Sequence, residues 1–281
     1  MTQVRDAFQE FLYAKRDLRV KTIEEKQQKL GAFCAWCEQH TITLEDIKAS
    51  TIRHFLETLD GKADLTKVGY ARVIKGFLRW CSREEEFEEA VKEKTANRIE
   101  IPSFQMPDIA IYSADDIKKL FAACEKEETP FLKVRNRAIL SVLLDTGIRA
   151  SECCYDNDRP QEHTGLRMQH VNLETFDSHI TVIGKGRGTG KSREIGLGDT
   201  ARKAIKLYLK QRSQRVLHES PYVFLGIREE APLTLRGLEM MIGRLGERAG
   251  IHAYCHKFRH TFTVNYLLQA GKDADGAALY K

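Results

Sequence analysis

Between residues 93 and 112 the chain loses the helical spacing of apolar side chains that precedes and follows this stretch, and Pro102 and Pro107 interrupt it. Proline lacks a backbone N–H and restricts the residue before it, so such a stretch typically links separately folded parts. A chain of 281 residues is long enough to form two hydrophobic cores. We therefore predict a first domain over residues 1–92, a linker over 93–112 and a second domain over 113–281.

The first domain reads as helices throughout. Thr22 with Glu25 three residues later has the pattern of a capping box, and an apolar periodicity of about 3.6 follows it. We predict helices over residues 4–15, from Thr22 to about 38, a short one from Thr43, another from Thr51, and one over 65–81. This is the pattern of a small helical bundle.

The helix predicted over residues 65–81 carries a basic ridge opposite its apolar face. Arg72, Lys75 and Arg79 follow one another at helical spacing, away from the side that Val73 and Phe77 occupy. Such a ridge either keeps a helix solvated or contacts a phosphate backbone. We predict DNA contact, and solvation remains the alternative.

The second domain combines helices with a small sheet. Ser113 and Asp116 form a capping-box pattern at its start, and residues 178–184 and 193–197 alternate like the two strands of a hairpin. We predict helices over 116–124, 133–144, 201–216, 234–249 and 257–270, and a surface loop over 155–164. The expected fold class is mainly α with a small antiparallel β-sheet.

Basic residues are concentrated in the second domain. The formal net charge is +5, and residues 185–215 contain ten lysines and arginines against two acidic residues. A local excess of this kind is typical of a surface that binds a nucleic-acid backbone, although a solvated basic face has the same composition. No apolar run approaches the ~18 residues that cross a bilayer, and no signal peptide is recognisable. We expect a cytoplasmic protein with no membrane association.

Cysteine spacing indicates neither disulfides nor a metal centre. The seven cysteines include Cys34 and Cys37 inside a helical pattern, which we interpret as buried thiols. Zinc binding by Cys153, Cys154 and His163 is the minor alternative. We predict no metal and no cofactor.

The glycine-rich stretch over residues 184–192 resembles a phosphate-binding loop only superficially. That loop needs a glycine five positions before Gly190, where this chain has Lys185, and it must open a helix, whereas a strand-like segment follows here. The stretch is better suited to a hairpin whose basic side chains reach DNA. Arg187, Lys191 and Arg193 are therefore predicted DNA contacts.

Two arginines and a histidine lie in contexts suited to one phosphodiester. Arg149 follows the helix break at Gly147, where its planar fork of donors can meet two phosphate oxygens, although a salt bridge to Glu152 is the alternative. His256 and Arg259 are three residues apart and share one face of a helical turn.

These segments together resemble the tyrosine recombinase (phage integrase) family. The resemblance rests on residues 146–152 (Thr-Gly-Ile-Arg-Ala-Ser-Glu), on Ile-Gly-Lys-Gly at 183–186 before Arg-Glu-Ile-Gly-Leu at 193–197, and on His-Lys-Phe-Arg-His at 256–260. It implies an N-terminal helical (SAM-like) core-binding domain and an α+β integrase-type catalytic domain. The implied partners are double-stranded DNA and further copies of the chain.

The resemblance also implies roles for individual residues. Arg149 and Arg259 would clamp the scissile phosphate, Lys185 would protonate the leaving 5′-oxygen, His256 would assist proton transfer, and Glu152 would orient the first arginine. Lys191 is a rival to Lys185 as the acid. The family uses a tyrosine nucleophile and needs neither metal nor ATP.

The chain departs from the family pattern at two places. Residues 155–164 look like an insertion, and the Leu-Gly-His motif that precedes the nucleophile in the family is absent after residue 271. We favour a nucleophilic tyrosine that lies beyond this sequence, which would leave the activity incomplete in this chain, and Tyr280 is the alternative as a displaced nucleophile. Tyr266 is predicted to be a core residue. The favoured function is site-specific recombination by strand cleavage and rejoining through a phosphotyrosine link. The alternatives are a catalytically inactive DNA-binding protein and a helical interaction protein.

Overall fold

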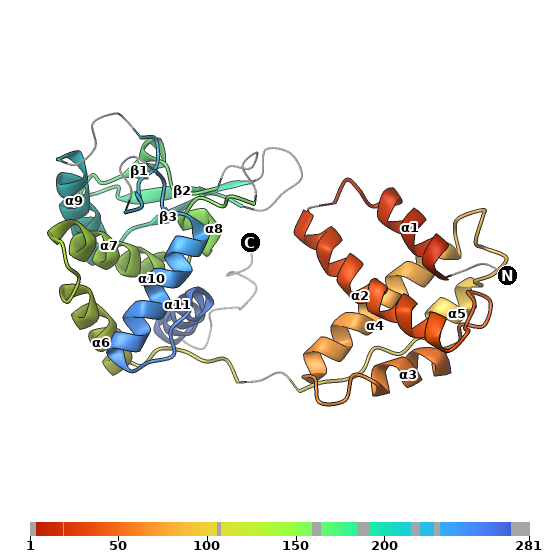
Figure 1. Ribbon diagram of the computed structural model, residues 1–281. Helices are drawn as coiled ribbons and strands as arrows, with labels where there is room; N and C mark the ends of the chain where they lie inside the picture. Colours follow the sequence, from red (N-terminus) through yellow and green to blue (C-terminus); the bar gives the residue numbers. More distant parts are fainter. Residues whose placement is uncertain are drawn as a thin grey trace. The chain divides into compact units, whose positions relative to one another are not determined.

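The computed structural model describes residues 4–18, 20–105, 108–158, 164–184, 191–214, 220–227 and 231–270. The chain divides into two compact units, Met1–Pro107 and Asp108–Lys281 (Figure 1). Each unit has its own core of buried apolar side chains, so each is described by itself.

The first unit is a bundle of helices arranged around one central helix. Its helices are α1 (Val4–Ala14), α2 (Val20–Gln39), α3 (Ala49–Glu57), α4 (Asp64–Cys81) and α5 (Glu93–Asn97). The central helix is α4, which packs against α1, α2, α3 and α5 (Figure 1). Aromatic rings fill the space between them, with Phe11 edge-on to Phe77 at 5.5 Å between ring centroids.

Three of the predicted helix starts in this unit are wrong. The α2 helix already begins at Val20, so Thr22 lies inside its first turn. Thr51 is likewise inside α3, where its hydroxyl accepts a hydrogen bond from the Lys48 amide at 3.1 Å. Thr43 starts only a turn, closed by hydrogen bonds from its amide and hydroxyl to Asp46. A threonine that satisfies an amide in a turn or first helical turn has the same sequence pattern as a helix cap.

The stretch predicted as a linker begins with ordered structure. The α5 helix lies within it, and Ala96 and Ile99 are buried in the core of the first unit. Lys75 donates a hydrogen bond of 2.5 Å from Nζ to the Ile99 carbonyl, and Arg79 donates to the side-chain carbonyl of Asn97 at 3.0 Å. The segment over 93–101 therefore belongs to the first unit, and the division between units falls after Pro107.

The second unit has the predicted fold class, since helices surround a small antiparallel sheet. Its helices are α6 (Ala114–Glu125), α7 (Pro130–Thr146), α8 (Ala150–Cys153), α9 (Asp199–Ser213), α10 (Leu235–Ala249) and α11 (Cys255–Ala270), with a 3-10 turn at Met168–His170. The α7 helix is buried over most of its length and packs against α6, α9 and α11 (Figure 1). The capping box of Ser113 and Asp116 at the start of α6 is confirmed.

The sheet has strand order β1 (Val171–Asn172), β2 (His179–Ile183) and β3 (Ser192–Gly196). The predicted hairpin is confirmed by the antiparallel pairing of β2 with β3, in which Ile180 lies opposite Ile195 and Val182 lies opposite Arg193. The two-residue strand β1 was not predicted, because two residues are too few to show an alternating pattern.

A buried cluster of polar side chains joins the segment just after α6 to helices α7 and α10 of the second unit. Glu127 is almost fully buried and accepts hydrogen bonds from Asn136 on α7 at 3.0 Å and from Arg244 on α10 at 3.1 Å. Arg248 completes the cluster with an ion pair of 3.1 Å to the same carboxylate oxygen. A buried carboxylate with this many donors fixes the packing of α7 and α10.

All seven cysteines are free, as predicted. Burial raises the pKa of Cys34, Cys37 and Cys255 to about 12, so these thiols are protonated at neutral pH. Within the described ranges no three His, Cys, Asp or Glu side chains are placed to share a metal ion, and His163 lies outside those ranges. No helix in the described part of the chain has both the length and the apolar character needed to cross a bilayer.

The loop predicted over 155–164 is described only at its ends. Tyr155 pairs with Thr234, and its amide donates to the Leu233 carbonyl at 3.0 Å. Asp156 and Thr164 are buried and joined by a hydrogen bond of 3.1 Å from the Asp156 amide to the Thr164 hydroxyl. Both ends are therefore anchored in the second unit, and residues 159–163 lie outside the described residues.

Candidate active site

A cavity of about 590 Å³ opens in the second unit at the junction of α8, α10 and α11. Arg149 and Arg259, predicted to share one phosphate, both line it, and His256 lies beside them. The remaining lining residues are Ile148, Ala150, Ser151, Leu235, Glu239, Ala253, Tyr254 and Cys255.

The backbone break before Arg149 directs its side chain toward this cavity. The α7 helix ends at Gly147, which adopts a left-handed conformation with φ of 58°, and Ile148 is buried. Arg149 then has an extended backbone immediately before the short helix α8. Glycine is the residue that adopts this left-handed conformation with least strain, so the Thr-Gly pair has a structural role in placing the arginine.

Glu152 holds Arg149 by both its backbone and its side chain. The Arg149 amide donates to Glu152 Oε2 at 2.8 Å, and Arg149 Nη1 donates to Glu152 Oε1 at 3.0 Å. The salt bridge weighed as an alternative is therefore present, yet the Arg149 side chain remains 43% exposed. Its guanidinium retains N–H groups that are free to face the cavity.

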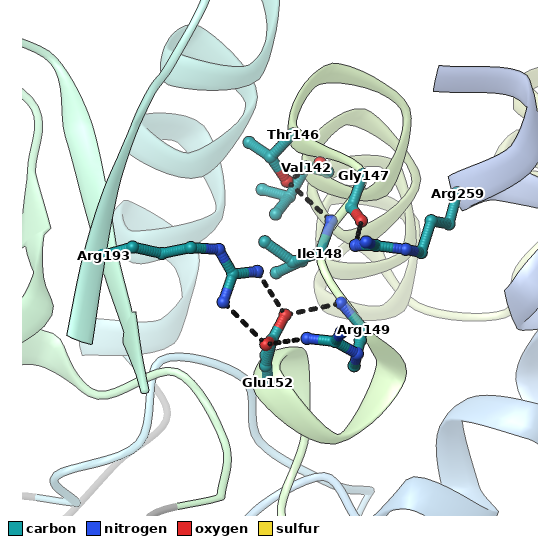
Figure 2. Close-up of polar contacts among 8 residues, drawn as sticks. All are labelled: Val142, Thr146, Gly147, Ile148, Arg149, Glu152, Arg193 and Arg259. Carbon is teal, nitrogen blue, oxygen red and sulfur yellow. Dashed lines mark hydrogen bonds and ion pairs between the residues drawn. The ribbon is translucent and has the colours of Figure 1, made fainter. Parts of the chain in front are cut away.

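Arg193 approaches Glu152 from the other side (Figure 2). Its Nη1 and Nη2 donate to Oε1 and Oε2 of Glu152, each at 2.9 Å, in a bidentate pair. Burial alone would raise the pKa of Glu152, but the hydrogen bonds from Arg193 and the Arg149 amide, together with the charges of both arginines, hold that pKa below its ordinary value. Glu152 is thus an ionised carboxylate between two guanidinium groups.

Arg259 and His256 lie on α11 and face the same cavity. Arg259 Nη1 donates a hydrogen bond of 2.6 Å to the carbonyl oxygen of Gly147, which joins α11 to the break before Arg149 (Figure 2). The His256 ring lies edge-on to the His260 ring with 4.2 Å between centroids. Burial, followed by the positive charges near it, lowers the pKa of His256, so its neutral form is favoured at pH 7.

The start of α11 is anchored by residues at the beginning of the second unit. The Tyr112 hydroxyl accepts from the Tyr254 amide at 3.0 Å and donates to the Tyr254 carbonyl at 3.2 Å. The Thr261 hydroxyl, fully buried, accepts from the Tyr112 amide at 2.9 Å. These bonds fix the backbone two residues before His256 and thereby fix the direction in which the histidine leaves the helix.

The other residues singled out in the sequence occupy different places. Lys185, Arg187 and Tyr280 lie outside the described residues. Lys191 is exposed just before β3. In the first unit Arg72 is exposed, whereas Lys75 and Arg79 donate to the backbone and side chain of the α5 segment.

Sequence reasoning missed three features of this region. The guanidinium of Arg193, a predicted DNA contact, is paired with Glu152, 41 residues away in the sequence, and this pairing was not predicted. Leu235 and Glu239, at the start of α10, line the cavity without any sequence signal that links them to Arg149. Tyr266 was predicted to be a core residue, and this is wrong, since it is 47% exposed on α11.

The geometry is suited to binding an anion. Two guanidinium groups from separate elements and one neutral imidazole border one cavity, and each guanidinium is fixed by a bond to its surroundings. Planar guanidinium groups bind phosphate oxygens through paired hydrogen bonds, and fixed donors stabilise charge that builds up in a transition state.

Comparison with known proteins agrees with this chemistry. The model of the phage integrase family matches residues 111–278, and the model of its N-terminal SAM-like domain matches residues 6–85. The chain belongs to the phage integrase family, the tyrosine recombinases that cleave and rejoin DNA strands.

The chain is also similar to individual recombinases over most of its length. It is 28% identical over 278 residues to tyrosine recombinase XerC of Oceanobacillus iheyensis, covering 95% of this chain and 83% of the relative. It is 30% identical over 239 residues to tyrosine recombinase XerC of Bacillus licheniformis, covering 82% and 70%. An inactive DNA-binding protein, the alternative considered from the sequence, is not favoured by these similarities.

Solved structures share the fold. The XerH site-specific recombinase bound to its difH substrate matches with a TM-score of 0.70 at 18% identity, covering 94% of this chain and 73% of that one. A lambda integrase dimer bound to a core site matches with a TM-score of 0.65 at 16% identity, covering 98% and 93%. The combination of a helical first unit and a helical second unit with a small sheet is therefore the recombinase fold.

Proposed function

We propose that the cavity bordered by Arg149, His256 and Arg259 is the active site of a site-specific recombinase that cleaves and rejoins double-stranded DNA through a phosphotyrosine link. The observation that carries this proposal is the convergence of two guanidinium groups, one from the residue just before α8 and one from α11, with a neutral imidazole on one cavity. A single phosphodiester in that cavity would meet donors on two sides.

In this proposal each residue has one task. Arg149 and Arg259 donate to the non-bridging oxygens of the scissile phosphate, where negative charge increases in the transition state. His256 takes up or relays the proton of the attacking tyrosine, for which its neutral form is the competent one. Lys185 gives a proton to the leaving oxygen, and Glu152 keeps Arg149 in place.

The bond changes in the first step balance without any added cofactor. The tyrosine oxygen bonds to phosphorus and its proton leaves, while the bond between phosphorus and the 5′-oxygen breaks and that oxygen takes a proton from Lys185. The product is a 3′-phosphotyrosine and a free 5′-hydroxyl. Attack by another 5′-hydroxyl reverses the step and joins new strands. Tyr280 is the nucleophile that we assign within this sequence.

We further propose that the chain acts as a homo-oligomer on DNA in the cytoplasm. Support comes from the recombinase fold, since XerH was solved on its difH substrate and lambda integrase as a dimer on a core site. Arg72, Arg187 and Lys191 are the residues that we propose for contact with the DNA backbone, and neutralising phosphates in this way makes binding fall steeply with salt.

Trapping the covalent intermediate tests the proposal directly. Duplexes that bind the protein would first be selected from a random-sequence pool and then made with a nick close to each candidate scissile phosphate, so that a short strand diffuses away after cleavage and rejoining is blocked. We expect a protein–DNA adduct that survives denaturation, and we expect its yield to be lost with Arg259→Ala.

Mapping the adduct identifies the nucleophile. Mass spectrometry of the digested adduct should place the nucleotide on the peptide that contains Tyr280, and Tyr280→Phe should abolish trapping. A nucleotide on Tyr254, which borders the cavity, or on the exposed Tyr266 would replace Tyr280 as the nucleophile. Tight, selective DNA binding without any adduct on any nicked duplex would overturn the proposal of cleavage by this chain.

A further inference from the structure

We propose that Arg193 is a positioning residue that keeps the guanidinium of Arg149 directed into the cavity by taking up the charge and part of the hydrogen-bonding capacity of Glu152. The proposal rests on the proposed function of the cavity, because Arg149 is the residue that would touch the phosphate.

The two arginines fill all the hydrogen-bonding positions of the Glu152 carboxylate. Its carboxylate accepts four bonds, two at each oxygen, and an ionised carboxylate has about four such positions. Arg149 supplies one amide and one guanidinium N–H, while Arg193 supplies the other two. The Glu152 side chain is only 4% exposed, so water has little access to replace a donor that is lost.

The charges of the three groups lead to the same conclusion. Two guanidinium groups and one carboxylate leave one positive charge on the cluster. Without Arg193, Glu152 and Arg149 would form a neutral pair, and the carboxylate would have two unfilled positions, with Arg149 as the remaining donor among the described residues that bond to it. Arg149 would then be drawn into a two-bond pair with Glu152, and its positive charge would no longer be available to a phosphate.

Arg193 itself is held by the sheet and does not face the cavity. It lies on β3 opposite Val182 of β2, and in Figure 2 it meets Glu152 on the side away from Arg149. The described residues that line the cavity include Arg149 and Arg259 but not Arg193. This location fits an action through Glu152 and does not fit direct contact with the phosphate.

A second bond attaches the same strand to the Arg149 segment. Just after β3, the Gly198 amide donates to Asp145 Oδ2 at 2.7 Å, close to the end of α7. Before β3, a Cβ atom placed on Gly184 would lie 3.6 Å from Arg193 Nη1. Arg193 therefore lies between two segments. One is the break at the end of α7 that places Arg149, and the other is Gly184, the residue before Lys185 in the sequence.

The test compares three variants with matched folding and binding measurements. Arg193→Gln removes the charge and the paired donors, Arg193→Lys keeps the charge, and Arg137→Gln is the control. Arg137 pairs with Glu125 at 2.8 Å on the exposed side of the same unit, away from the cavity. Thermal unfolding establishes that each variant is folded.

The first measurement needs no cleavage. The Nε–Hε resonance of Arg149, assigned by its loss in Arg149→Lys, reports the surroundings of this guanidinium in the protein without DNA. We expect a clear shift or broadening in Arg193→Gln, a smaller change in Arg193→Lys, and no change in the control. An unchanged Arg149 resonance in a folded Arg193→Gln protein would overturn the proposal, even if the wild-type chain cleaved no DNA.

The second measurement separates cleavage from binding. At saturating protein, single-turnover cleavage of the nicked duplex should fall about 10²-fold in Arg193→Gln, the loss typical of a misplaced group, with affinity for the duplex changed by less than about threefold. Arg193→Lys should recover part of the rate. Equal losses in rate and affinity would instead make Arg193 a DNA contact. If Arg193→Gln fails to fold, the same comparisons are made with Arg193→Lys.

Discussion

Arg259 Nη1 donates a hydrogen bond of 2.6 Å to the carbonyl oxygen of Gly147, two residues before Arg149 in the chain. This bond joins the two arginines of the cavity through a single peptide segment, although they are 110 residues apart in the sequence. A displacement of α11 relative to the end of α7 would therefore alter both guanidinium positions together.

Replacement of either arginine should slow cleavage far more than it weakens binding. We expect Arg149→Ala and Arg259→Ala to lower single-turnover cleavage by about 10²- to 10³-fold, because fixed donors act mainly on charge that develops in the transition state. DNA affinity, measured by anisotropy, should change by much less. Equal losses in both quantities would reduce the arginines to a binding role.

Gly147→Ala should destabilise the second unit for two separable reasons. The residue has φ of 58°, and a Cβ atom there would clash with the ring of Phe262 on α11. Gly250 has a similar φ of 67° with open space around it, so Gly250→Ala measures the backbone strain alone, about 1 kcal/mol. The clash should add about 1–3 kcal/mol to the loss in Gly147→Ala.

Urea unfolding of the two alanine variants measures this difference. Adding Phe262→Leu to Gly147→Ala should recover part of the loss, because the smaller side chain leaves room for the new methyl group. Equal destabilisation by the two glycine replacements would contradict the close approach of Phe262.

The pH dependence of cleavage should show an acid limb from His256. Burial and then the nearby positive groups lower the pKa of His256 from 6.5, so the imidazole is neutral at pH 7 and gains a proton only as the pH falls below 6.5. Cleavage that needs the neutral ring should therefore be constant between pH 7 and 8 and fall in acid. The unfolded chain binds this proton first, so folding stability from this group is also lost as the pH falls.

Ring-proton NMR titration and a pH–rate profile measure this limb. His256→Asn should remove it, whereas His54→Asn, on the exposed surface of the first unit, should leave it in place. A midpoint for His256 at or above 6.5 would be inconsistent with the surroundings described here.

Loss of the buried carboxylate at Glu127 should destabilise the second unit strongly. Glu127→Ala leaves Asn136, Arg244 and Arg248 without the acceptor they share, and removing one member of a buried charge cluster typically costs about 3–5 kcal/mol. Glu125→Ala is the control, because it breaks only the exposed pair with Arg137, worth about 0–1 kcal/mol. Calorimetry measures the loss of stability in each variant from the thermal unfolding transition of the second unit. A loss at Glu127 no larger than at Glu125 would contradict the assigned network.

The general acid can be identified by changing the leaving group. Sulfur in place of the bridging 5′-oxygen departs as a thiolate, which needs no proton because a thiol has a pKa of about 8.5. Lys185→Ala should slow cleavage of ordinary DNA and leave cleavage of the sulfur-containing DNA near the wild-type rate. Lys191→Ala should show no such selective recovery, and the opposite pattern would make Lys191 the acid.

Much of this fold follows from local signals in the sequence. Apolar periodicity identified the long helices, and the capping pattern at Ser113 and the hairpin of β2 and β3 were also recognisable. Two helix starts failed because Thr43 and Thr51 bond within a turn or the first helical turn, where the local pattern of a cap is the same. The start at Thr22 was wrong by two residues, since α2 begins at Val20.

The site was predictable only in part for a different reason. Motifs in the sequence identified Arg149, His256 and Arg259, because the residues that make up each motif are close together in the chain. The pairing of Arg193 with Glu152 depends on how β3 packs against α8, and the place of Glu239 on the cavity depends on how α10 packs. Such long-range relationships leave no trace in spacing along a single chain, so the pairing of Arg193 with Glu152 could not be predicted.

The two contacts that attach β3 and the residue just after it to the Arg149 segment have a practical meaning for recombinase engineering. Arg193 with Glu152 and Gly198 with Asp145 make the sheet and the end of α7 interdependent. A chimera could take its sheet from one relative and its α7–α8 turn from another. The residues at positions 193 and 198 would then come from a different protein than the residues at 152 and 145 with which they bond. The exchangeable piece in this enzyme therefore runs from Asp145 to Gly198 as one block, and graft boundaries inside it should give folded proteins with poor turnover.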